Sequence, residues 1–344
     1  MPGVRGANDT HRSPVHTGYL MSVSARAFLS RREYFMLAAP VVPLLAQFST
    51  GVRVVNVFVT VRDKQGKLVN NLTRDDFELT EDGRKQSLRY FSARSDLPIT
   101  IGLLFDISGS QRSVIAEQRE AAAAFLKQVL RDSTDQAFLL GFDQRVRPLE
   151  PLTGQRARIE AGLQRLEVPR DGAGQLLPEA QGTALNDAVA AAAHILASQA
   201  GRKAMVVLSD GIDTASSLRL NAAIEAAQRA DALIYPIRFY DLKVFAYDVP
   251  SPAIDHLREG KKVLERMAHE TGGGFLEVSG TQNLAANFSR LEEELRNQYS
   301  LGYTSSATGG SYRGSRGVSY RKIRVSVKPK GLTVQARDGY YPAE

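Results

Sequence analysis

The 344-residue chain contains no cysteine, which excludes disulfide bonds, cysteine–zinc sites and thiol chemistry. Several enzyme signatures are also absent: there is no Gly-x-Ser-x-Gly elbow, no phosphate loop ending in Gly-Lys-Ser/Thr, and no Gly-x-Gly-x-x-Gly after a strand. The five histidines are scattered, and His269-Glu270 lacks the second histidine of a zinc-protease helix. These absences favour binding over catalysis, so we do not expect an enzyme.

The chain also has little excess charge outside its amino terminus. The formal net charge is +7, but residues 1–46 hold five arginines against Asp9 and Glu33, which leaves +4 for the remainder. No block of lysine and arginine interleaved with aromatic residues follows. We therefore expect no nucleic-acid partner.

No apolar run is long enough to span a bilayer comfortably, which needs about 20 residues. The longest candidate, Phe35–Ala46, is interrupted by Pro40 and Pro43 and follows a pair of arginines. This order resembles a twin-arginine export signal. We expect residues 1–46 to be an export signal and a disordered extension, and the protein to be periplasmic or extracellular. It is open whether residues 35–46 are cleaved or stay as a membrane anchor. It is also open whether Met1 or Met21 is the true start.

Both ends of the remaining chain have strand patterns. Val55, Val57, Val59 and Val61 alternate with other residues, as in a half-buried strand. Further strands are predicted at Phe77–Thr80, Gln86–Phe91, Tyr299–Tyr303, Lys322–Lys328 and Leu332–Ala336, with a hairpin at Asp82-Gly83 and a loop at Gly309–Gly317. Because residues 47–96 are too few for a core of their own, we expect them to pair with residues 298–344 in a small β-sandwich-like domain.

The middle of the chain, residues 97–297, alternates apolar strands with helices. Strands are expected at Ile99–Phe105, Gln136–Phe142, Lys203–Ser209, Leu233–Phe239 and Phe275–Val278. Helices are expected at Ser113–Leu130, Ala157–Leu166, Ala184–Ala200, Leu218–Ala230, Lys261–Glu270 and Leu284–Asn297. This alternation predicts an α/β fold, with a Rossmann-like, doubly wound, mostly parallel sheet covered by helices on both faces.

Oxygen-bearing side chains follow two of these strands and precede one helix. Asp106 ends the first strand, and Ser108 and Ser110 follow at alternate positions. Thr183 stands at a predicted helix start, and Asp210 follows the Lys203–Ser209 strand. Ligands of parallel sheets bind at the carboxyl ends of the strands, so the five residues are expected on one rim. Such oxygen donors suit a hard divalent cation.

Each residue also has an ordinary structural interpretation. Ser108 and Ser110 would cap the helix near Ser113, Thr183 would be an N-cap, and Asp210 would be a turn residue. Their joint occurrence on one rim favours the metal site. Asp187 either supports the site or is simply solvated, and we assign no role to Asp213.

The Asp-x-Ser-x-Ser of residues 106–110, the Gly-Thr of 182–183 and the Ser-Asp-Gly of 209–211 resemble the von Willebrand factor type A domain and its metal-ion-dependent adhesion site. The resemblance covers about residues 97–297. The flanking segments Thr73–Phe77, Glu81–Gly83 and Asp338–Tyr341 resemble exported type A-related proteins of Acidobacteria.

The resemblance implies a ligand set. Ser108 and Ser110 would coordinate the metal directly, and Thr183 directly or through water. Asp106 and Asp210 would act through water or as acceptors for the ligands. One position would remain for a carboxylate of a partner. Mg²⁺ suits this arrangement, with Mn²⁺ or Ca²⁺ as alternatives.

The expected function is a metal-dependent protein-binding or adhesion module that grips an acidic side chain of a partner. The segments Asp143–Pro151 and Pro169–Gly182 are predicted to be loops that take part in binding. Membrane contact is expected only through the amino-terminal segment, if it is retained. The alternatives are an accessory subunit of an envelope assembly and, less favoured, a metal-dependent hydrolase.

Overall fold

The computed structural model describes residues 54–93, 97–131, 134–239, 251–278, 284–305, 312–313 and 319–342. The predicted export signal and most of the predicted loop at 309–317 lie outside these ranges. Among the described residues, no helix is long and apolar enough to cross a bilayer.

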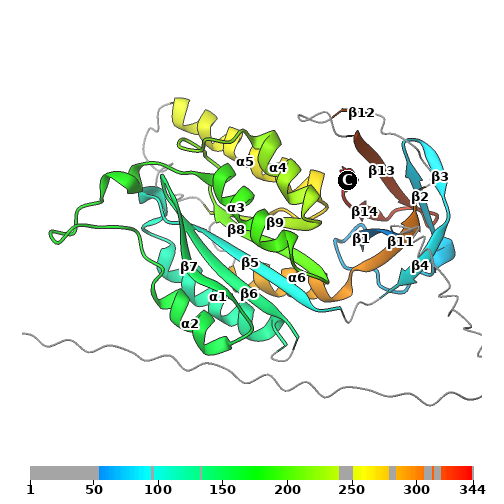
Figure 1. The fold of residues 1–344 in the computed structure, drawn as a ribbon, viewed down its shortest axis with the longest axis horizontal. Coiled ribbons are helices and arrows are strands. Elements are labelled where there is room, and N and C mark those ends of the chain that lie inside the picture. Colours follow the sequence, from blue (N-terminus) through cyan, green and yellow to red (C-terminus); the bar gives the residue numbers. More distant parts are fainter. Residues whose placement is uncertain are drawn as a thin grey trace, which may run out of the picture. The chain divides into compact units, whose positions relative to one another are not determined.

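A six-stranded sheet forms the centre of the α/β part, in the order β10-β9-β8-β5-β6-β7 (Figure 1). Five strands run parallel, and β7 joins β6 antiparallel at one edge. The strands are β5 (Ile99–Asp106), β6 (Gln136–Phe142), β7 (Val146–Thr153), β8 (Arg202–Ser209), β9 (Ala232–Phe239) and β10 (Leu276–Val278). Every residue of β5 and β9 is buried, as expected for strands covered on both faces.

Helices cover both faces of this sheet (Figure 1). Side chains of α1 (Ile115–Val129), α2 (Arg156–Gln164) and α6 (Leu284–Asn297) share one apolar core, in which Phe125 stacks on Phe288. Side chains of α3 (Leu185–Ala197), α4 (Leu220–Arg229) and α5 (Ser251–Thr271) form the other core. The doubly wound fold is therefore confirmed, although α5 begins well before the predicted Lys261.

The Asp143–Pro151 segment was predicted to be a loop, and this prediction was wrong. Strand β7 occupies most of it and pairs with β6 through two register shifts. Pro148 and Pro151 obscure the strand pattern in the sequence. An edge strand accepts prolines because one side of its backbone needs no partner.

Segments from both chain ends pair in two further sheets, which share one apolar core. One has the order β14-β1-β11-β4 and the other β12-β13-β2-β3, with β15 paired to β13 (Figure 1). Their bounds are β1 (Val54–Arg62), β2 (Phe77–Glu81), β3 (Arg84–Gln86), β4 (Leu88–Ser92), β11 (Tyr299–Thr304), β12 (Tyr312–Arg313), β13 (Ser319–Val327), β14 (Thr333–Gln335) and β15 (Gly339–Tyr340).

The core of this β part contains the predicted inward side chains of β1. Val55, Val57, Val59 and Val61 are buried, as the alternation predicts. The expected strand Gln86–Phe91 is instead divided. Its beginning belongs to β3, which pairs with β2, whereas β4 crosses to the other sheet and pairs with β11. The domain boundaries near residues 96 and 297 stay a prediction.

Candidate metal centre

The carboxyl ends of β5 and β8 bring two of the candidate side chains to one rim. The two strands are parallel neighbours, with Phe105 opposite Leu208. Asp106 is the last residue of β5, and Asp210 follows the last residue of β8. This adjacency follows from the parallel register.

Asp106 is held by hydrogen bonds on both of its carboxylate oxygens. Oδ1 accepts from the Ser108 N–H at 3.0 Å, and Oδ2 accepts from the Ser209 hydroxyl at 2.8 Å. Its side chain is completely buried. Burial, together with the charge of Asp210, raises the pKa of Asp106 to about 7 although the hydrogen bonds act in the opposite direction.

The hydroxyls of Ser108 and Ser110 lie 3.0 Å apart, and that of Ser110 donates to Oδ2 of Asp210 at 3.3 Å. Neither hydroxyl caps the short helix η2 (Gly109–Gln111) or α1. The helix-capping interpretation is therefore not supported for these residues. Ser108 is buried, whereas Ser110 is exposed, so solvent reaches the site from the Ser110 side.

Asp210 lies in a turn as well as in the candidate site. Its Oδ1 accepts from the Ile212 N–H at 3.0 Å, as in an Asx turn. Its Oδ2 also accepts from the side chain of Gln111 at 3.4 Å, and Gln118 donates to Gln111 at 3.2 Å. Burial raises the pKa of Asp210. Asp210 is therefore both a turn residue and part of the hydrogen-bonded group.

Thr183 is connected to this rim through its backbone. Its carbonyl accepts from the N–H groups of Thr214 and Ala215, and its N–H donates to the Thr214 hydroxyl at 3.1 Å. These residues belong to the loop that begins at Asp210. Within the described residues, the Thr183 hydroxyl has no hydrogen bond to the other four candidates. The structure thus joins Asp106, Ser108, Ser110 and Asp210 directly, and Thr183 only through the loop.

Two acidic residues whose roles the sequence did not decide stabilise that loop through hydrogen bonds. Asp213 accepts from the Asn186 N–H at 2.8 Å in the first turn of α3, and from the Ser216 hydroxyl at 2.6 Å. Asp187 accepts from the N–H groups of Ser217 and Leu218, both at 2.9 Å. Asp187 is therefore a supporting residue, and Asp213 caps α3 from outside the helix.

The donor set fits a hard divalent cation. Two buried carboxylates lie near each other, and a bound cation would offset both their burial and their repulsion. The remaining candidates are neutral hydroxyls, which supply oxygen ligands without adding negative charge, so that a carboxylate of a partner could take a further coordination position. Among the described residues, no group of three or more histidine, aspartate or glutamate side chains is placed to hold a metal. Cation binding at this rim would therefore depend on the hydroxyls as well as on the two carboxylates.

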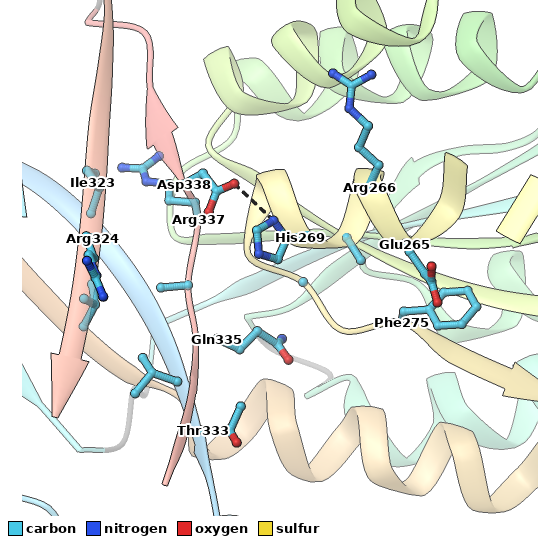
Figure 2. A pocket seen from close by; sticks show the side chains of 15 residues that line it. Glu265, Arg266, His269, Phe275, Ile323, Arg324, Thr333, Gln335, Arg337 and Asp338 are labelled. Atoms are coloured by element: carbon cyan, nitrogen blue, oxygen red, sulfur yellow. Dashed lines mark ion pairs between the residues drawn. The ribbon is translucent and has the colours of Figure 1, made fainter. Parts of the chain in front are cut away.

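A hollow of about 720 Å³ lies elsewhere in the structure, away from the carboxyl ends of β5 and β8. Figure 2 shows the side chains that line it. Its walls come from the end of α5 and from β13 and β14. His269 and Asp338 form an ion pair across it at 3.1 Å (Figure 2). It contains none of the five candidate ligands.

Residues 101–212 match the von Willebrand factor type A domain, and this span includes all five candidate ligands. The chain contains a von Willebrand factor type A domain. The observed sheet is mostly parallel and covered by helices on both faces, as the resemblance implied. The resemblance of the flanking segments to proteins of Acidobacteria stays a prediction.

Solved structures similar to the chain include an aerotolerance-related membrane protein from Bacteroides fragilis. It is 17% identical, with a TM-score of 0.42, over 58% of this chain and 98% of that one. A von Willebrand factor type A protein from Catenulispora acidiphila is 13% identical, with a TM-score of 0.45, over 77% of this chain and 73% of that one. These likenesses concern the fold alone. No curated protein matches the chain.

Sequence reasoning missed two supporting residues, Ser209 and Gln111, and assigned no role to a third, Asp213. Ser209 carried a weak signal, since it belongs to the Ser-Asp-Gly that ends β8. Gln111 directly follows Ser110, but nothing in the sequence shows that its amide turns toward Asp210. Asp213 acts on a helix 27 residues earlier in the chain, which only the folded loop reveals.

Proposed function

We propose that the chain is an exported, metal-dependent protein-binding module. Mg²⁺ would bind at Asp106, Ser108, Ser110, Thr183 and Asp210, with Mn²⁺ or Ca²⁺ as substitutes. An acidic side chain of a partner protein would complete the coordination. The observation that carries this proposal is the hydrogen-bonded group of two carboxylates and two hydroxyls at the carboxyl edge of the sheet, inside the type A domain.

Several further observations support a binding role. The exposed hydroxyl of Ser110 gives a partner access to the site. The Pro169–Gly182 segment lies beside the candidate site. The space that a Cβ on Gly109 would occupy is in contact with the Leu176 side chain and the Ala180 carbonyl. Type A domains are in general interaction modules rather than enzymes. We therefore propose no catalytic residue, and export to the periplasm or cell exterior rests on the amino-terminal segment alone.

Calorimetric titration of the purified protein with Mg²⁺ and Mn²⁺ tests the metal site. We expect saturable binding that Asp106→Ala and Ser110→Ala abolish. Ser217→Ala is the matched control, because its exposed side chain lies in the neighbouring loop and should leave binding unchanged. Absence of binding to the unaltered protein, or equal binding by Asp106→Ala, would contradict the proposal.

Capture of proteins from envelope extract tests the partner. Retention should require Mg²⁺, disappear with EDTA and disappear in Ser108→Ala. A protein retained equally under all three conditions would show that the metal site is not the interface. An accessory role in an envelope assembly would be indicated instead by metal-independent retention of the same fixed set of proteins.

A further inference from the structure

Strand β13 has one edge whose backbone is partly unpaired. On the side facing β2, the Lys322 carbonyl accepts from Asp82, and the Lys328 N–H donates to Asp76. Backbone groups alternate between the two edges of a strand, so Ile323, Val325 and Val327 face the other edge. There, Ile323 donates to the Asp338 carbonyl at 2.7 Å. Among the described residues, nothing pairs with the backbone of Val325 or Val327.

Strand β14 presents a second open edge to the same hollow. It is the terminal strand of its sheet and pairs only with β1 within the described residues. The Val61 carbonyl is turned away from β14, because it accepts from Val69. Val334, which lies opposite Val61, therefore directs its own N–H and C=O away from β1. Both Val325 and Val334 line the hollow of about 720 Å³.

Open strand edges bind extended chains through backbone hydrogen bonds, and neighbouring pockets then select the side chains. This hollow has apolar lining from Phe275, Ile323 and Val325. Its lining also includes charged side chains, of which Arg266, Arg337 and Asp338 already have ion-pair partners. Arg324 is exposed, and among the described residues no carboxylate forms an ion pair with it.

We propose that the β13 edge at Val325 and Val327 is a docking site for an extended segment of a partner protein. The segment adds a short strand to β13, places alternate apolar side chains in the hollow and sets a carboxylate against Arg324. This site shares no residue with the candidate metal centre, so a partner bound here needs no metal.

Proline substitutions test the two edges of β13 separately. Val325→Pro and Val327→Pro remove N–H groups on the edge opposite β2 and leave every hydrogen bond to β2 in place. Ser326→Pro is the matched control for fold damage, because its N–H faces β2. Arg324→Gln removes the charge without altering the backbone.

The probe is a displayed library of random dodecapeptides, selected on the immobilised full-length protein in EDTA. We expect enriched peptides that alternate apolar residues and carry an acidic one. By fluorescence anisotropy, Val325→Pro and Val327→Pro should each weaken their binding at least tenfold, and Arg324→Gln about fivefold. Asp106→Ala should have no effect. Peptides that bind Val325→Pro as tightly as the unaltered protein would overturn the proposal, as would a selection that yields no binder.

Amide hydrogen exchange supplies a test that needs no variant. The Val325 and Val327 N–H groups should exchange rapidly in the free protein and at least tenfold more slowly with an enriched peptide bound. Unchanged exchange would overturn strand addition. Two other occupants would also overturn the proposal of a partner: a second copy, shown by dimers that Val325→Pro dissociates, and residues 1–50, shown by peptide binding only after their removal.

Discussion

The hydroxyl of Ser209 donates a 2.8 Å hydrogen bond to the carboxylate of Asp106, and both side chains are completely buried. Ser209 also accepts from the Gly211 N–H at 3.1 Å, so one hydroxyl connects the ends of β5 and β8. Together with the Ser108 N–H, this contact holds both oxygens of a buried carboxylate whose pKa is raised by burial and by the charge of Asp210. Ser209 is therefore a positioning residue for the candidate metal centre.

Ser209→Ala should weaken Mg²⁺ binding by about 10- to 100-fold, since removing a group that orients metal ligands has effects of this size. The free energy of unfolding should fall by about 1–3 kcal/mol, because Oδ2 of Asp106 loses its buried donor. Calorimetry and urea unfolding measure the two effects. The control is Ser217→Ala, which should change neither. Unaltered Mg²⁺ affinity in Ser209→Ala would show that Ser209 does not position Asp106 for the metal.

The sequence predicts most of this fold because its strands are continuous apolar runs bounded by polar turns. Gln136–Phe142 and Leu284–Asn297 have in the structure the bounds that the pattern predicts. Strand β7 could not be predicted, because the prolines at an edge strand resemble those of a loop. The beginning of α5 was predicted too late, although Ser251-Pro252 has the order of residues that often starts a helix.

The candidate site, like the fold, could be predicted from the sequence only in part. Asp106, Ser108, Ser110 and Asp210 could be placed together from the sequence because parallel strands end at one edge of a sheet. The supporting hydrogen bonds could not be placed, because they depend on rotamers and loop paths. Asp213 illustrates this, since its contact with α3 exists only once the loop after β8 has folded back.

Asp213→Ala should destabilise the start of α3. The variant loses an acceptor for the Asn186 N–H, and lost N-caps cost about 1 kcal/mol. A thermal midpoint lower by about 2–4 °C is expected, as measured by circular dichroism. Because Thr183 binds to the same loop through its carbonyl, Mg²⁺ affinity should also fall.

Asp213→Asn is the matched control for this prediction. It retains an oxygen that can accept from Asn186 but loses the acceptor for the Ser216 N–H, so its thermal midpoint and Mg²⁺ affinity should lie between those of Asp213→Ala and the unaltered protein. A lower midpoint in Asp213→Ala with an unchanged Mg²⁺ affinity would show that the position of Thr183 does not matter to the metal, and would remove Thr183 from the ligand set.

Arg202 connects the parallel sheet with the β part through a buried polar network. Its guanidinium donates to the Leu295 carbonyl and the Gln298 side chain, and lies 4.9 Å from the ring centre of Phe58. Gln298 in turn donates to the Thr60 hydroxyl at 3.0 Å. Burial lowers the pKa of Arg202 to about 10, but the group stays charged at neutral pH.

Arg202→Met should therefore lower the free energy of unfolding by about 3–5 kcal/mol, because buried partners lose a charged donor. Calorimetry should show two transitions in place of one if this network couples the two parts. Arg229→Met, which removes a surface ion pair with Glu225, should change stability by no more than about 1 kcal/mol. A single unshifted transition in Arg202→Met would show that the network does not couple them.

Asp135 gives the protein a defined sensitivity to acid. Burial acts to raise its pKa, but hydrogen bonds from Arg296, the Ile99 N–H and Arg131 outweigh burial and lower the pKa to about 2. Since the unfolded chain has the ordinary value of 3.8, the ionised group stabilises the fold fully above that pH. This stabilisation is lost as the pH falls from about 4 through 2.

Asp135→Asn should accordingly lower the thermal midpoint at pH 7 by several degrees, and the difference from the unaltered protein should shrink as the pH falls below 4. Thermal unfolding followed from pH 7 to pH 2 measures this difference. Because the Ile99 N–H lies at the opposite end of β5 from Asp106, Mg²⁺ affinity at neutral pH should not change. Ser217→Ala, which removes an exposed side chain without a titratable group, is the control and should leave the thermal midpoint unchanged across this range. A constant difference between Asp135→Asn and the unaltered protein across this range would mean that the carboxylate charge contributes nothing beyond its hydrogen bonds.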